Sequence, residues 1–218
     1  MSWSEVSELL VVGLQETAWM VGVSTLLTAV GGLLLGVLLV LTAPGGLLAA
    51  PPVASLLGLV VNITRSLPFI ILLVAIIPFT RAVVGTTIGT DAAIVPLTIG
   101  AIPFYARIVE AALREVPADV VAAATAMGAT RREIVGKVLL REARPGLVAG
   151  LTITVIALVG YSAMAGVVGG GGLGDLAIRY GYQRFETEVM IATVVMLVIF
   201  VQLVQMAGDV LVRRLSHR

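Results

Sequence analysis

Few residues of this sequence could do chemistry, and the first to examine is Ser162. It stands in the order Gly160, Tyr161, Ser162 within an apolar segment, as the nucleophile of a hydrolase elbow would. That elbow needs glycine where Met164 stands, and the single histidine, His217, lies in the basic tail. A hydrolase acting inside the membrane remains an alternative for which no general base is visible.

The second candidate is the glycine run 169–172, because glycine-rich loops can cradle phosphates. Such a loop requires Gly-Lys-Ser/Thr after its glycines, and Leu173, Gly174 and Asp175 follow here instead. The chain has no cysteine, which also excludes thiolate metal sites and a cysteine nucleophile. We therefore expect no enzymatic activity, no bound ATP and no metal in this chain, and interpret the run as a flexible turn.

The elements around these residues are long apolar runs. With 59% hydrophobic and 12% charged residues among 218, the chain has too little polar surface for a water-soluble globule. Lipid leaves unpaired backbone groups unsatisfied, and the runs lack the alternation of barrel strands, so we expect helices. The predicted fold is an all-α membrane protein, a single domain 1–218. Its five transmembrane helices are expected at about residues 17–42, 53–79, 92–113, 147–168 and 189–212.

The distribution of Lys and Arg between the runs predicts the orientation. Arg114 and segment 117–146 together carry six basic residues, and the tail after residue 212 carries three more on the same side. The other side carries only Arg81, Arg179 and Arg184. Because cytoplasmic loops collect Lys and Arg, segment 117–146 and the C-terminus are expected in the cytoplasm and the N-terminus outside.

Segment 117–146 is a polar island between the third and fourth runs. Its first helix is expected to end at Gly128, which can adopt the left-handed conformation that closes a helix. Thr130 and Glu133 then form a predicted capping box that starts a second helix. Pro145 is expected, with the following glycine, to redirect the chain.

The first helix of this segment has a face of small residues, formed by Ala122, Ala123, Ala124 and Ala126. A helix that lies on lipid headgroups needs bulky apolar anchors, which this face lacks. A shallow face is better suited to enter a cleft in another protein. We therefore predict a docking surface, with a lipid-surface helix as the alternative.

The spacing within the island resembles the cytoplasmic loop motif of permease subunits in type I ATP-binding-cassette importers. The motif positions are Gly128, Val138, Leu140, Ala143, Pro145 and Gly146. The family's glutamate is replaced here by Ala122, and its first motif proline by Arg141. Segments 65–73, 77–81, 93–98, 126–130 and 159–164 look like the methionine importer permeases, so the similarity covers nearly the whole chain.

This resemblance implies a permease subunit in a bacterial cytoplasmic (inner) membrane, with a path for L-methionine and also D-methionine. It implies pairing with a second copy, with two ATPase subunits that would hold ATP and magnesium, and with an external methionine-binding lipoprotein. Membrane lipid surrounds it, and no nucleic acid is implied. Another amino acid as cargo, or a scaffold with no energy source, are the alternatives. The island would be the coupling region, with the contact residues Ala122, Ala123, Ala124, Ala126, Met127, Gly128, Ala129, Thr130 and Glu133.

The translocation path has its own candidates. Arg65 lies inside the second run, where inserting an arginine into the membrane costs about 2.5–3.5 kcal/mol. We therefore expect its guanidinium to have a bonding partner. It faces the path, or it bonds to carbonyls that Pro68 frees. In the fourth run, the hydroxyls of Tyr161 and Ser162 could bind a zwitterionic cargo, and Met164 could form a flexible apolar wall or gate of the path. The alternative is that these residues only pack the helices together. The full set of path or gate candidates is Arg65, Ser66, Pro68, Tyr161, Ser162 and Met164.

Two further patterns concern assembly. Arg107, Glu110 and Arg114 stand at helical spacing and predict an ion network on the third helix. The sequence contains no internal repeat, so one chain does not supply two halves of a pathway, and a homodimer is expected.

Overall fold

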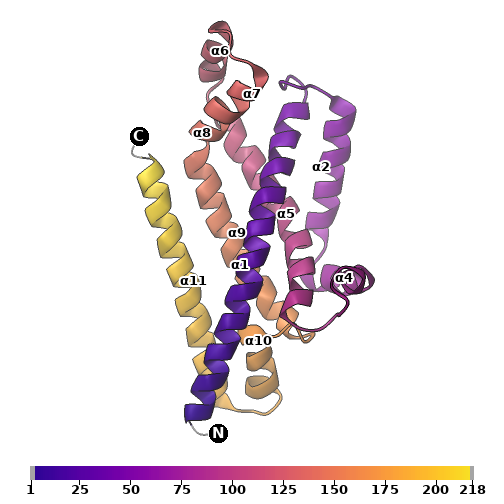
Figure 1. Cartoon of the computed structure of the whole chain (residues 1–218), viewed down its shortest axis with the longest axis vertical. Helices are drawn as coiled ribbons and strands as arrows, with labels where there is room; N and C mark the ends of the chain where they lie inside the picture. The colour runs from indigo at the N-terminus through magenta and orange to yellow at the C-terminus, as the bar shows by residue number, and fades with distance from the viewer. Residues whose placement is uncertain (1–2, 217–218) are drawn as a thin grey trace.

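The computed structural model describes residues 3–216, and all of its regular elements in this range are helical. They form an elongated bundle in which the start of α1 and the region of α6 lie at opposite ends (Figure 1). Four helices in the described range are long and apolar enough to cross a membrane: α1 (Trp3–Thr42), α5 (Thr90–Arg114), α9 (Arg144–Gly166) and α11 (Thr187–Ser216). The prediction of a helical membrane protein is confirmed.

The centre of the bundle is formed where α1, α5 and α9 meet. Met20 of α1, Leu97 of α5 and Leu158 of α9 are completely buried in one apolar cluster. Further along, α1 and α5 cross closely because α1 has glycine at the contact: a Cβ on Gly36 would lie 2.6 Å from Val109. The small residues of α1 therefore set the distance between the two central helices.

The second apolar run, where a span at 53–79 was expected, does not form one straight helix. It is divided into α2 (Pro51–Ser66), α3 (Phe69–Ala75) and α4 (Ile77–Val84), and the direction changes by 104° between α2 and α3. Pro68 has no N–H to continue the helix, and it keeps Leu67 extended, at φ −82° and ψ 128°. In Figure 1, α4 lies across the bundle while α2 runs along it.

The polar island forms a helical tip at the end away from the start of α1. It comprises α6 (Ala118–Ala126), α7 (Arg131–Glu133), the π-helical η1 (Ile134–Leu139) and α8 (Leu140–Glu142). The break before the next helix falls at Ala143, and Pro145 lies in the first turn of α9. The expectation that Pro145 redirects the chain is therefore wrong: a first-turn proline needs no N–H partner and starts α9.

The opposite end is closed by a short helical segment. After α9 the chain forms α10 (Gly172–Leu176) and the π-helical η2 (Ala177–Tyr182) before α11 begins. Leu173 and Leu176 pack with Val6 and Leu10 of α1 and with Val189 of α11. This segment thus packs against both the first and the last long helix.

Candidate functional site

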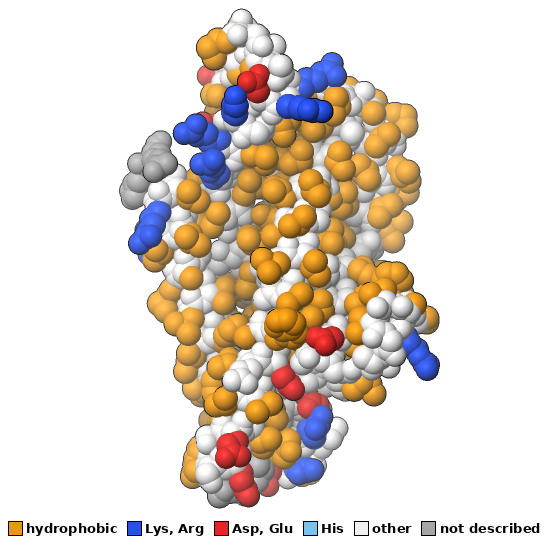
Figure 2. Space-filling model, in the orientation of Figure 1, with side chains coloured by type: hydrophobic (Ala, Val, Ile, Leu, Met, Phe, Trp, Pro, Cys, Tyr) orange, Lys and Arg blue, Asp and Glu red, His pale blue; other side chains and the backbone are white. Residues whose placement is uncertain are grey.

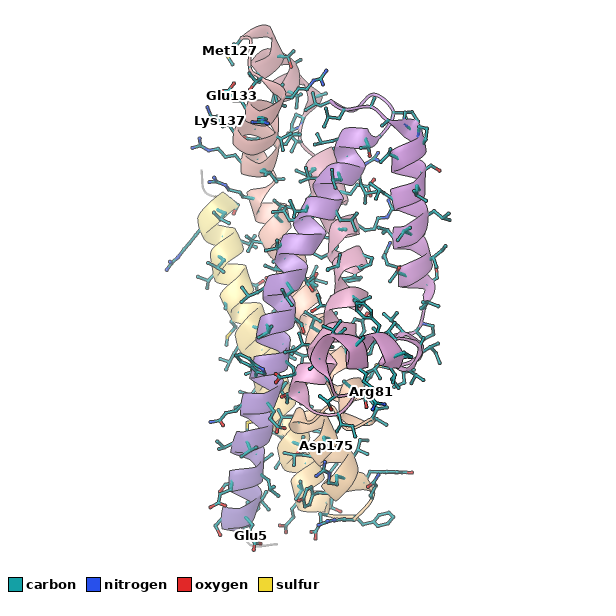
Figure 3. The ribbon with its side chains drawn as sticks, turned by 45° about the vertical axis from the view of Figure 1, so that its right-hand side comes forward. Glu5, Arg81, Met127, Glu133, Lys137 and Asp175 are labelled. Atoms are coloured by element: carbon teal, nitrogen blue, oxygen red, sulfur yellow. The ribbon has the colours of Figure 1, made fainter. Side chains whose placement is uncertain are left out.

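The tip of the molecule presents small side chains around one large exposed one. Ala122, Ala123 and Ala126 of α6 are exposed, and Met127 has 82% of its surface exposed. Met127 lies at the end of the bundle farthest from the start of α1 (Figure 3). Ala124 does not belong to this face, contrary to expectation, because it is 6% exposed and packs inward.

A left-handed glycine and a capping box shape the turn behind this face. Gly128 has φ +82°, as predicted for the residue that ends the first helix. Both capping-box bonds are present: Glu133 N–H donates to Thr130 Oγ1 (3.4 Å), and Thr130 N–H donates to Glu133 Oε2 (3.1 Å). Ala129 is half-buried within the turn and donates to the Ala124 carbonyl (3.1 Å). The predicted turn is confirmed.

The Glu133 carboxylate has a further partner in Lys137, whose Nζ lies 2.9 Å from Oε1. Both side chains lie on the same side of the tip, below Met127 (Figure 3). The Lys137 ammonium, followed by the Thr130 N–H and hydroxyl, lowers the pKa of Glu133 from 4.5 to about 2. Glu133 is therefore ionised throughout the physiological range and holds the start of the second helix.

The inner side of the tip is attached to α5 by an apolar cluster. Ala124 of α6, Ile134 and Leu139 of η1, and Val109 and Leu113 of α5 are all buried in it. Side chains packed in one cluster leave little room for α6 to shift without displacing its neighbours. The tip is part of the bundle and not a loose loop.

Basic side chains gather at this end of the molecule, above a largely apolar surface (Figure 2). None of Arg131, Arg132, Arg141 and Arg144 has an ion-pair partner among the described residues, whereas Lys137 pairs with Glu133. The opposite end carries acidic and basic side chains together (Figure 2). The tip is thus the positively charged end of the bundle.

Two of the predicted path residues meet in one pocket. Tyr161 of α9 stacks flat on Phe69 of α3, with ring centroids 4.6 Å apart and an 8° angle between planes. Arg65, near the end of α2, lines the same pocket. The pocket has a volume of about 220 Å³. Its lining residues are Thr64, Arg65, Leu67, Phe69, Leu72, Gly100, Phe104 and Tyr161.

The other predicted path residues lie elsewhere. The Ser162 side chain is buried at 2% exposure and donates to the Val159 carbonyl (2.8 Å), so its hydroxyl is not offered to the pocket. Ser66 likewise donates to the Asn62 carbonyl (2.8 Å). Neither Pro68, which precedes α3, nor Met164 lines this pocket. Met164 is exposed on α9.

The predicted ion network on α5 is present. Glu110, at 8% exposure, accepts from Arg107 and from Arg114, the latter at 2.7 Å. Arg107 also donates to the Asn62 side chain (2.8 Å) and to the Gly58 carbonyl (3.3 Å). The network therefore also connects α5 to α2, a link that the sequence pattern did not reveal.

Sequence reasoning missed the role of Glu16, which contacts the end of the glycine run 169–172. Glu16 accepts from the Gly172 N–H (2.6 Å), and Thr17 Oγ1 accepts from the Leu173 N–H (2.9 Å). Gly171 and Gly172 have φ +77° and +78°, conformations that glycine permits. The end of the run is therefore hydrogen-bonded to α1, a contact that the sequence pattern did not reveal. A carboxylate inside a long helix was the available signal.

The chain matches known proteins over nearly its whole length. Residues 32–218 match the family model "Binding-protein-dependent transport system inner membrane component". A relative from Vibrio cholerae, "Probable D-methionine transport system permease protein MetI", is 55% identical over 97% of this chain and 94% of its own length. In Bacillus subtilis, "Methionine import system permease protein MetP" is 46% identical over 76% of this chain and 75% of its own.

A solved structure gives the same result for the fold. A chain of the inward-facing MetNI methionine ABC transporter superposes with a TM-score of 0.96 at 54% identity, covering 99% of both chains. An amino acid ABC transporter crystallised with histidines shares the fold, with a TM-score of 0.80 at 18% identity. The bundle is that of a membrane permease. The chain belongs to the family of binding-protein-dependent transport system inner membrane components.

Proposed function

We propose that this chain is the permease subunit of an ATP-driven methionine importer and forms its translocation path. The observation that carries the proposal is the 54% identity to the MetNI chain, over 99% of both chains at a TM-score of 0.96. Relatives named as D-methionine and methionine permeases support the same cargo. Because ATP-binding-cassette systems place hydrolysis in another subunit, the chain itself performs no enzymatic reaction.

The tip is the coupling region in this proposal. The exposed residues Ala122, Ala123, Ala126, Met127, Gly128 and Thr130 would enter a groove of the ATPase, with Glu133 fixing the turn behind them. Ala124 and Ala129 act from the inner side, where they hold α6 in position. Movement of the ATPase would then reach α5 through the apolar cluster that Ala124 shares with Ile134 and Leu139 of η1 and with Val109 and Leu113 of α5.

The assembly follows from the same comparison. The MetNI transporter supports pairing with a separate ATPase and with a second copy of the permease. We infer two ATPase subunits, which hold ATP and magnesium, and an external methionine-binding lipoprotein as further partners. No cofactor or nucleic acid is assigned to this chain.

The membrane arrangement has five spans if α2 and α3 are counted as one broken span. The basic tip and the end of α11 then lie in the cytoplasm, and the start of α1 lies outside. The path would run past the break between α2 and α3. There Arg65 and Tyr161 line the pocket, while Ser66, Pro68 and Ser162 shape the helices that form it. Met164 stays a proposed gate residue.

Uptake of radiolabelled methionine tests this proposal. The gene is deleted in a strain without other methionine carriers and then restored, with a Gly128→Val variant as the uncoupled control. Restored uptake that requires ATP, and that Gly128→Val abolishes at unchanged membrane level, is the expected result. Uptake that is indifferent to the deletion would remove the methionine assignment. Uptake of another amino acid alone would replace the cargo but keep the permease.

A further inference from the structure

Two arginines lie inside apolar runs of this chain, and they differ in their surroundings. Arg107 is bonded to Glu110, Asn62 and the Gly58 carbonyl. Arg65 has no hydrogen bond or ion pair within residues 3–216, and its side chain is exposed. A guanidinium in such a position is costly unless it receives an anionic partner. Within the described residues, Arg107 therefore has bonding partners and Arg65 has none.

The structure rejects the alternative in which Arg65 bonds to carbonyls freed by Pro68. The Asn62 carbonyl accepts from the Ser66 hydroxyl at 2.8 Å, and the Thr64 carbonyl accepts from the Leu67 N–H at 3.3 Å. These groups at the end of α2 are therefore satisfied without Arg65. Its five N–H donors remain available to a ligand.

The space in front of Arg65 has a polar end and an apolar wall. Thr64 and Arg65 form the polar end, and the stacked rings of Phe69 and Tyr161 form the wall with Phe104. Its volume of about 220 Å³ is smaller than the roughly 300–1,000 Å³ of pockets for drug-sized ligands. A small molecule with one anionic end and one apolar end matches this arrangement.

We propose that this pocket is a transit site for a free α-amino acid with an apolar side chain, whose carboxylate is received by Arg65. The proposal rests on the importer function above and names the part of the cargo that the path recognises. A guanidinium binds a carboxylate through two parallel N–H bonds, a geometry that lysine does not reproduce. The aromatic wall takes the side chain, and a thioether makes favourable contacts with ring edges.

Weak binding is what a path requires. Arg65 is exposed on this chain, so none of the described residues closes over a carboxylate bound to it, and a ligand can leave as readily as it enters. Gly100 keeps the pocket open: a Cβ there would lie 3.3 Å from Leu72 Cδ2 and 3.4 Å from Phe69 Cδ2. A large side chain at position 100 would fill the pocket.

The test measures ligand contact with the permease–ATPase complex in lipid nanodiscs, without the external binding protein. Saturation-transfer NMR compares L-methionine with L-methioninamide, which lacks the carboxylate. The wild-type complex is expected to prefer methionine about tenfold or more, the effect of losing a charged hydrogen bond. Arg65→Gln is expected to abolish this preference, and Arg65→Lys to keep only part of it.

Two variants control for indirect effects. Arg81→Gln removes an exposed arginine of α4 that lies outside the pocket (Figure 3), and it is expected to behave as the wild type. Gly100→Leu is expected to remove the signal of both ligands. Arg65→Gln is expected to reach the membrane at least as well as the wild type, since it removes a charge from an apolar run.

An Arg65→Gln complex that still prefers methionine overturns the transit site, as does a wild-type complex without any preference. Uptake into proteoliposomes is measured in parallel, with the binding protein and ATP present. Absent wild-type uptake counts against the importer function itself. Normal uptake together with an unchanged preference in Arg65→Gln counts against the transit site alone.

Discussion

Arg107 of α5 donates a hydrogen bond of 2.8 Å to the side chain of Asn62 in α2, and so connects the two helices through residues 45 positions apart in sequence. The same arginine is oriented by Glu110, which also accepts from Arg114. Glu110 is thus the centre of a network that joins α2, which ends at the pocket, to α5, which supports the tip. The network thus links the helix that ends at the pocket to the helix that supports the tip.

Replacing Glu110 should weaken the bundle. Glu110→Ala leaves Arg107 and Arg114 without their carboxylate, and we expect a loss of about 1–3 kcal/mol in unfolding free energy. Glu115→Ala, one turn further along at an exposed position without an ion pair, should change stability little. Denaturant unfolding in detergent checks both variants. Equal stability of the two would show that the network contributes nothing.

The left-handed turn at Gly128 makes a second prediction, with a matched glycine as its control. Gly128→Ala places a side chain at φ +82° and should cost about 1–2 kcal/mol locally, although its Cβ would meet no atom within 4 Å. Gly136 also has an open Cβ position but no positive φ, so Gly136→Ala should be tolerated. ATP hydrolysis by the assembled transporter, with the binding protein and methionine present, should fall for the first variant only. A parallel fall in both would contradict the assignment of the effect to the backbone conformation of Gly128.

The pH dependence of the tip should follow Glu133. Its pKa is lowered to about 2 in the folded tip, so its stabilising effect is complete above the ordinary value of 4.5. The effect is lost as pH falls through about 2. Hydrogen exchange of residues 131–139, corrected for intrinsic rates, should show constant protection from pH 7 to 5 and declining protection below 4.5.

Two variants separate Glu133 from general acid unfolding. Glu133→Gln should give a flat pH profile at lower protection, because the titrating group is absent. Lys137→Gln removes the first cause of the lowered pKa, so the decline should still begin near 4.5 but be smaller and end at a higher pH than in the wild type. A profile that is the same in all three proteins would contradict the assignment to Glu133.

At the opposite end, the contact of Gly172 with α1 predicts a local effect. A Cβ at Gly172 would lie 2.6 Å from Thr17 Oγ1, and the residue has φ +78°, so Gly172→Ala should displace the start of α10. Thr17→Val removes only the 2.9 Å bond to the Leu173 N–H and should have a smaller effect. Faster hydrogen exchange in residues 173–182, with an unchanged tip, is the expected readout. Unchanged exchange in Gly172→Ala would show that this junction is not rigid.

Local patterns in the sequence predicted local structure well. Four of the five apolar runs became long helices, because the length and composition of each run suffice to specify one. The turn at Gly128 and the capping box of Thr130 with Glu133 were also predictable, since they depend on residues within one turn of each other.

Contacts between distant segments were not predictable from these patterns. Pro68 signalled a bend, but the 104° change of direction depends on what packs against α3. The small size of Ala124 did not show that it faces inward to α5. Glu16 and Gly172 are 156 residues apart and meet only because α10 folds back onto α1.

The central claim, that the tip docks on a separate ATPase, is tested most directly by cross-linking in the assembled complex. A photoreactive residue at Met127, 82% exposed at the tip, is compared with one at Phe185, 84% exposed between η2 and α11 at the other end (Figure 1). Our account predicts that position 127 captures the ATPase, with a yield that changes with bound nucleotide, and that position 185 does not. Capture of phospholipid alone at position 127 would contradict it.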